Sequence, residues 1–427
     1  MTSEVLVFNK KAMVLAADSA VTSSAGASGS RPRYSKTANK IFELSPNGNV
    51  AVAIFGGASL DAVPWEVAIK LFRRSLSGPP LGTVSEYVDR LVAFLRANDQ
   101  LFPPALRAAF VQAQFESATV AVMNRAGQLN GSITDVATAA ADRSAAWAAV
   151  HPQLVAEFGV APVDVSLTSA ALDEVLRALD TDWVPVLLGY QAQYPVLEGV
   201  DLRQLAELAH RLRYSSPTNF IGSTGIAVAG FGAAEIFPQY RLLHVHGHVG
   251  DEVVVSNDKA GGISHAEGSL ILPLAQKSMI DLFTDGFGFS LWSIIESEAT
   301  SALDGLVADL RAAGVDLSVA DVAALSAARH RSFMQGWTRK NWKENYDPLM
   351  DVLTTLSVEE MAHLAETLLT LQSLKERVTS ASEEVGGPID VAAITKGEGL
   401  VWLKRKHFFP ADLNARYLHR LAGQVNA

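Results

Sequence analysis

The sequence predicts an α+β protein in which helices pack in layers against antiparallel sheet. Short apolar runs separated by turn residues lie near both ends of the chain, as strands and hairpins require. The stretches between them carry apolar residues at three- and four-residue spacing, which is the helical period. Of the 427 residues 49% are hydrophobic and 19% are charged, which is enough apolar material for a core.

The first sixty residues are predicted to form two hairpins. Residues 4–8 and 12–17 are apolar runs bridged by the polar segment Asn-Lys-Lys. Residues 40–44 form a third predicted strand, and the turn sequence Ser-Pro-Asn-Gly joins it to a fourth at 50–54. Runs that are apolar on both sides are typical of a sheet covered on both faces.

The rest of the chain alternates helical and strand patterns. Helices are predicted at 60–76, 84–97, about 105–114 and 270–283. Strands are predicted at 118–123, 225–229, 240–249 and 253–255, and a closing hairpin at 389–395 and 400–405. The whole chain, 1–427, is interpreted as one domain that carries two large helical insertions, at about 130–215 and about 290–350.

Composition excludes several functions. The chain has no cysteine, which excludes disulfides, thiolate metal sites and a cysteine nucleophile. Its 35 Lys and Arg against 45 Asp and Glu give a net charge of −10, so nucleic-acid binding is not expected. Neither an apolar run of about 18 residues nor a signal sequence is evident, so we expect no membrane span and a cytoplasmic protein.

Register arithmetic places four residues of chemical interest together. In a first hairpin that turns about Lys10, opposed residue numbers sum to about 20, so Thr2 lies opposite Asp18. In the second hairpin Lys40 falls opposite residue 53 or 54. If the two hairpins share one sheet, four residues cluster at one end of it: Thr2, Asp18, Lys40 and Gly56.

These residues have the chemistry of a self-contained nucleophile. Removal of Met1 would leave Thr2 with a free α-amine, so that its hydroxyl attacks while its own amine accepts the proton. An α-amine has a reference pKa of about 7.7–8.0, and an ammonium on Lys40 would lower it. Asp18 would hold Lys40 in place, and the N–H of Gly56 could stabilise a developing oxyanion.

The same segments resemble proteasome β-type subunits and their bacterial relatives, which are N-terminal-nucleophile (Ntn) hydrolases. The motifs that carry the resemblance are Thr2 with VLAADSAVTS, ANKIFELSPNGNVAVAIFGG, AVAGFGAAEIFPQYRLLHVHG and VGGPIDVAAITKGEG. They cover about half of the chain: roughly 2–60, 218–285 and 357–405. The ending looks especially like that of the bacterial ancestral-β-type proteins.

The resemblance implies a fold, a reaction and an assembly. The fold is an αββα sandwich, with two antiparallel sheets between helical layers. The reaction is amide hydrolysis through Thr2 without metal or cofactor, with Asp18 and Lys40 as the tuning pair and Gly56 as the oxyanion donor. A ring-like homo-oligomer is expected, and any unfoldase partner stays unidentified.

One departure concerns the segment before the paired glycines 386 and 387, where the family carries an Asp and a Ser. Ser382 takes the position of that Asp, and Val385 the position of the Ser. We therefore assign Ser382 to the site, with Ser380 or a neighbouring glutamate as alternatives.

Other functions stay open at this point. The substrate is a peptide, or alternatively a small amide cleaved by the same mechanism, and a third alternative is an inert structural or binding homologue. His244, His246 and His248 alternate on a predicted strand near Asp251, which is compatible with a metal site or with a half-exposed strand face. The face is the preferred interpretation, and no metal is assigned.

Overall fold

The computed structural model describes residues 3–23, 33–45, 49–158, 169–216, 223–315, 319–379, 386–407, 409–410, 412–416 and 419. Within them the chain is an α+β protein whose strands form two five-stranded antiparallel sheets. Two short hairpins lie outside these sheets: β3 (Val21–Ser23) with β4 (Arg33–Ser35), and β7 (Ser59–Leu60) with β8 (Val63–Pro64).

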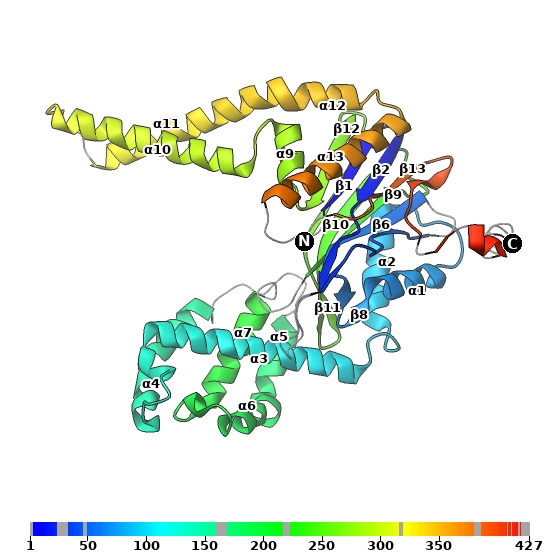
Figure 1. Cartoon of the computed structure of the whole chain (residues 1–427). Coiled ribbons are helices and arrows are strands. Elements are labelled where there is room, and N and C mark those ends of the chain that lie inside the picture. Colours follow the sequence, from blue (N-terminus) through cyan, green and yellow to red (C-terminus); the bar gives the residue numbers. More distant parts are fainter. Residues whose placement is uncertain are drawn as a thin grey trace.

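Each sheet combines strands from distant parts of the sequence (Figure 1). The first has the order β12 (Ser269–Ala275), β1 (Ser3–Asn9), β2 (Ala12–Ala17), β13 (Asp390–Thr395), β14 (Gly399–Lys404). The second has the order β11 (Glu252–Gly262), β10 (Gln239–Val249), β9 (Thr224–Phe231), β6 (Asn49–Gly56), β5 (Ile41–Glu43). The three predicted hairpins are confirmed as β1–β2, β5–β6 and β13–β14.

Alternation along the strands separates the layers of the molecule. On β1, Leu6 and Phe8 face the second sheet and join one core cluster with Ala51 and Ala227. Val5 on the same strand has the opposite parity and packs in the cluster that contains α13 (Val358–Thr379). The two sheets therefore pack face to face, with the first sheet covered by helices on its outer face.

Helices cover both outer faces. On the second sheet these are α1 (Trp65–Ser75) and α2 (Val84–Ala97), whose buried side chains join those of β6, β9 and β10. On the first sheet α13 is joined by α9 (Ser278–Asp285) and α12 (Asp347–Leu353). The order of layers is helix, sheet, sheet, helix. None of the described helices is both long enough and apolar enough to cross a bilayer.

The two stretches expected to be helical insertions have different organisation. The first is a lobe with its own buried core, made of α3 (Pro104–Leu129), α4 (Ala140–Phe158), α5 (Ser169–Arg177), α6 (Val184–Gln191) and α7 (Leu202–Ser215). The second contains α10 (Phe289–Ala312) and α11 (Val319–Asn341), which project from the body as a two-helix arm (Figure 1).

Two predicted elements are wrong. Residues 118–123 are part of α3 rather than a strand, because Phe115, Ala118 and Val122 follow a helical period and pack in the lobe core. Residues 270–283 are not one helix: β12 ends at Ala275 and α9 begins at Ser278. β12 pairs with β1 alone, and an edge strand tolerates Pro273.

Candidate active site

Asp18 lies at the end of β2, beside the first described residue of β1. Its side chain is only 2% exposed. Oδ1 accepts a hydrogen bond from the backbone N–H of Ser3 at 3.0 Å, and Oδ2 accepts one from Gly386 at 2.9 Å. The carboxylate is thus held by two backbone amides from opposite ends of the sequence. Ser3 N is also the atom that closes the peptide bond from Thr2.

Lys40 precedes β5 and is 3% exposed. Its Nζ forms an ion pair with Asp18 Oδ1, and a second ion pair with Glu4 Oε1 at 3.1 Å. The backbone carbonyl of Lys40 accepts from Ile54 N at 2.9 Å, so Lys40 lies opposite residue 54, as the register of the second hairpin predicts. Three side chains form the buried cluster: Glu4, Asp18 and Lys40.

The geometry of the cluster differs from the sequence prediction in two ways. The register of the first hairpin sums to 21, with Glu4 opposite Ala17, so the residue across from Asp18 is Ser3 rather than Thr2. The two hairpins also belong to different sheets, since β1 and β2 lie in one and β5 and β6 in the other. Lys40 therefore reaches Asp18 across the interface between the sheets, not along one of them.

A small pocket of about 150 Å³ lies directly beside Lys40. Gly56 and Gly57, at the end of β6, line it together with Lys40 and the side chain of Glu66. Gly56 has φ +78°, a conformation that a residue with a Cβ rarely adopts. The predicted oxyanion glycine and the predicted lysine thus share one cavity.

Two of the predicted site residues, Thr2 and Ser382, lie outside the described residues. What the structure places nearby is the chain on either side of them. The backbone N–H of Ser3 donates to the carboxylate of Asp18. The backbone N–H of Gly386, where the described chain resumes, donates to the same carboxylate. Ser19 further anchors this segment, because its Oγ donates to Pro388 O at 2.5 Å.

Glu4 was missed by the sequence interpretation. It stands in an apolar strand and shares its face with Leu6 and Phe8, which point toward the second sheet. A carboxylate at such a position needs a buried partner, because an unpaired buried charge is strongly unfavourable. The position of Glu4 on the inward-facing side of an alternating apolar strand was the sequence signal that could have identified it as a buried site residue.

In the part of the site that the structure describes, the two carboxylates of Glu4 and Asp18 share the ammonium of Lys40, and all three side chains are almost completely buried. Carboxylates stabilise a cationic group nearby. A free amine at residue 2 would be such a group, since Ser3, its neighbour in the chain, already contacts Asp18.

A second buried pair joins Asp61 and His248. Asp61 Oδ2 accepts from both Nδ1 and the backbone N–H of His248, and His248 Nε2 lies 3.2 Å from Leu95 O. Both ring nitrogens lie within hydrogen-bond distance of an oxygen atom, so the orientation of the ring is fixed from two sides. Neither side chain has exposed surface. Gly247 makes room for this pair, because a Cβ there would lie 2.5 Å from Asp61 Oδ1.

The three alternating histidines do not form one site. Register irregularities in β10 on either side of His244 and Val245 break the alternation. His244 packs edge-on against Phe55, His246 Nε2 is hydrogen-bonded to Ser256, and His248 contacts Asp61. Burial, followed by the charge of Lys259, lowers the pKa of His244. Among the described residues no three metal-binding side chains come together.

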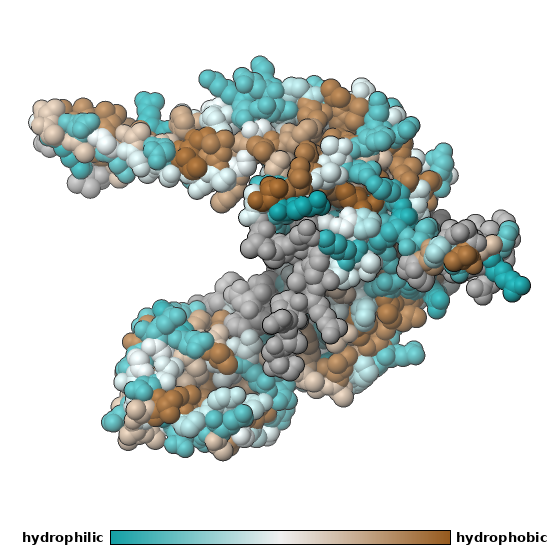
Figure 2. Space-filling view, viewed as in Figure 1, coloured by the Kyte–Doolittle hydropathy of each residue, from teal (hydrophilic) through white to brown (hydrophobic). Residues whose placement is uncertain are grey.

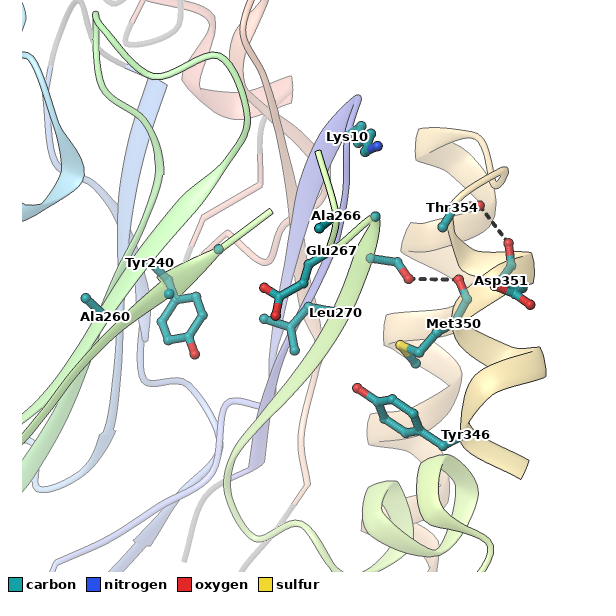
Figure 3. Close-up of a pocket in the computed structure, with 14 residues that line it drawn as sticks. Lys10, Tyr240, Ala260, Ala266, Glu267, Leu270, Tyr346, Met350, Asp351 and Thr354 are labelled. Carbon is teal, nitrogen blue, oxygen red and sulfur yellow. Dashed lines mark hydrogen bonds between the residues drawn. The ribbon is translucent and has the colours of Figure 1, made fainter. Parts of the chain in front are cut away.

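A larger pocket, of about 970 Å³, lies at the far end of the strands (Figure 3). Lys10, Tyr240, Glu267 and Tyr346 line it. Lys10 follows the end of β1 that is opposite to Ser3, and its Nζ already donates to His265 O at 3.0 Å. The pocket contains none of the predicted site residues.

No protein-family model matches the chain, and no curated protein is similar to it at a significant level.

Proposed function

We propose that the protein is an amino-terminal threonine hydrolase of the Ntn kind that cleaves amide bonds in peptides. The observation that carries the proposal is the buried cluster of Glu4, Asp18 and Lys40. Asp18 accepts a hydrogen bond from the N–H of Ser3, the residue that follows Thr2, and Lys40 lines a pocket. The order of layers and the glycine at the end of β6 support the same interpretation.

In the proposed reaction Thr2 carries the free α-amine of the mature chain. Its hydroxyl oxygen attacks the carbonyl carbon of the substrate, and the hydroxyl proton passes to the α-amine. The substrate C–N bond then breaks, and the leaving amine takes that proton. Water hydrolyses the ester left on Thr2, with the same amine as base, so neither a metal nor a cofactor is consumed.

The charged residues set the basicity of that amine. Lys40 lowers the pKa of a nearby amine through like-charge repulsion, whereas Glu4 and Asp18 raise it. The two carboxylates also favour the ammonium that forms when the proton is transferred. The N–H of Gly56, beside Lys40 in the pocket, is the proposed donor to the oxyanion.

The first test is whether residue 2 is the amino terminus. Intact-mass measurement of the purified protein is expected to show the loss of one methionine residue. A fluorogenic peptide panel is then expected to show turnover that Thr2→Ala abolishes and Thr2→Ser partly retains. Thr37→Ala is the matched control, because Thr37 is an exposed threonine that does not line the pocket.

Small acyl amides belong in the same panel. Thr2-dependent turnover of these alone would assign the amidase reaction in place of the peptidase. Retention of Met1, together with no Thr2-dependent turnover on either class, would contradict the enzyme proposal.

A further inference from the structure

The arm formed by α10 and α11 has almost no core of its own. No residue of α10 is buried, and among the described residues of α11 only Met334 is. Helices gain most of their stability from packing an apolar face, and those without such packing are marginal in water. The described part of the arm therefore buries little apolar surface that would stabilise its two helices.

Large apolar side chains are exposed along both helices of the arm. Figure 2 shows hydrophobic surface along its length. The exposed fraction reaches 78% for Phe289, and the other members of the set are also well exposed. They are Leu291, Ile294, Leu306, Leu325 and Phe333. Exposed apolar side chains in this number on one projecting element indicate an interaction site.

A groove of about 560 Å³ runs between the two helices. Leu303 and Val307 line it from α10, and Val322 and His330 from α11. His330 Nε2 is a buried atom that has no hydrogen-bond partner among the described residues. The groove thus offers apolar surface together with one unsatisfied polar atom.

The two helices carry opposite charges. Helix α10 has four acidic residues and one arginine, for a net charge of −3. Helix α11 has one acidic residue against three arginines and one lysine, for a net charge of +3. In the part of the arm that the structure describes, the acidic residues of α10 form no ion pair with the basic residues of α11. A surface with both signs arranged in this way is complementary to a copy of itself.

We propose that the arm docks against the arm of a second copy of this chain, so that α10 of one copy lies on α11 of the other. Two such hairpins form a four-helix bundle, the usual way for antiparallel helix pairs to bury apolar faces. A helix of 24 residues is about 36 Å long, and two helices side by side are about 20 Å wide. The resulting face, about 700 Å² per copy, is close to the ~800 Å² of a stable interface.

This inference does not use the proposed hydrolase activity, and each can fail without the other. The site cluster lies at the beginning of β1, whereas the arm leaves the body after α9. Pairing through the arm does not depend on any contact between the bodies of two copies. Variants that prevent arm pairing are therefore expected to halve the mass of the assembly.

The decisive experiment reverses the sign of the net charge on one helix of the arm at a time. In one variant Glu298→Lys and Asp309→Lys change α10 from −3 to +1, and in the other Arg329→Glu and Arg331→Glu change α11 from +3 to −1. All four side chains are exposed, so the fold of each copy should be kept. Each variant alone is expected to show half the wild-type mass by light scattering after size exclusion.

Mixing the two variants is the control for misfolding. In the mixed pair each helix again meets a helix of opposite sign, so the wild-type mass is expected to return. A variant mass equal to that of the wild type, or a mixture that stays dissociated, would overturn the proposal. So would a wild type that is already a single copy.

Removal of the arm gives an independent measurement. Asn341 Nδ2 donates to Asp285 O, so the two ends of the arm lie next to each other at its base. Deletion of residues 289–340 should therefore leave a folded body, as circular dichroism would show, at half the wild-type mass. Unchanged mass would also overturn the proposal.

Discussion

Two groups of buried ionisable side chains in this protein have similar parts and different surroundings. The cluster of Glu4, Asp18 and Lys40 borders a pocket at the start of the chain. The pair of Asp61 and His248 is closed in by β10 and α2 and has no exposed surface. Both include a carboxylate that accepts a hydrogen bond from a backbone N–H and contacts a basic side chain.

The difference is one of access. The Asp61–His248 pair is fully enclosed, which is how a structural pair is held. The cluster borders a pocket through Lys40, and ionisable groups beside such a cleft are candidates for a functional site. Burial of charge therefore does not identify a site by itself, and the following variants separate the two roles.

The largest expected effect is on turnover. Lys40→Met removes the ammonium that pairs with Glu4 and Asp18, and the Thr2-dependent kcat/KM is expected to fall by about 10²- to 10⁴-fold. Rates are normalised to folded protein, because the change also removes a buried ion pair from each carboxylate. Lys70→Met is the matched control, since Lys70 is 62% exposed. Full activity of the Lys40 variant would remove it from the proposed mechanism.

The next effect is on stability alone. Asp61→Ala leaves the buried ring and the backbone N–H of His248 without their shared hydrogen-bond partner, which is expected to cost about 1–3 kcal/mol of unfolding free energy. Urea denaturation measures it, with Asp89→Ala as a control at an exposed carboxylate. A strong loss of kcat/KM in the folded fraction would show that the enclosed pair acts on the reaction after all.

A third buried ionisable group extends the comparison to the lobe. His210 stacks on Phe115 beside Trp183, its two ring nitrogens have no partner among the described residues, and burial lowers its pKa to about 2. The unfolded chain binds this proton near pH 6.5 and the folded chain does not. Stability should therefore fall by about 1.4 kcal/mol per pH unit below pH 6.5.

His210→Phe is expected to remove that slope, because phenylalanine fills the same space without a proton to bind. Thermal midpoints measured from pH 7 to pH 4.5 provide the readout. His363→Phe, at an exposed position, should keep the slope of the wild type. An identical slope in the His210 variant would contradict the prediction.

The smallest expected effect on stability comes from a glycine beside the cluster, which is compared with a glycine beside the Asp61–His248 pair. Gly56→Ala places a Cβ at φ +78°, which is expected to cost about 1–2 kcal/mol and to lower turnover beside Lys40. Gly247→Ala should cost more, because the added Cβ meets Asp61 and Phe110, yet it should leave turnover per folded molecule nearly unchanged. Urea denaturation and peptide turnover of both variants test the contrast.

Local patterns predicted more of this molecule than long-range ones did. The hairpins and the meeting of Asp18 with Lys40 follow from turn residues and register. The arrangement of the two hairpins in separate sheets does not, because alternation defines a face and not the sheet to which a strand belongs. Lys40 meets Asp18 as predicted, although the assumption that both hairpins share one sheet was wrong.

The residues that were missed have a common cause. Glu4 and Asp61 are acidic residues that usually signal exposure, and only tertiary partners explain their burial. Asp61 meets His248 across 187 positions of sequence, at a backbone conformation with φ +46°. Register irregularities in β10 likewise change the direction in which its histidines point. No pattern of residues in the sequence predicts these irregularities.

The pocket beside Lys40 sets a limit on chemical probes for this protein. A void of about 150 Å³ accommodates about one benzene-sized group. An electrophilic inhibitor with a benzyl or isobutyl substituent should label residue 2, whereas one with a fused bicyclic ring should not. Selective labelling of this kind would allow active molecules to be counted in a preparation.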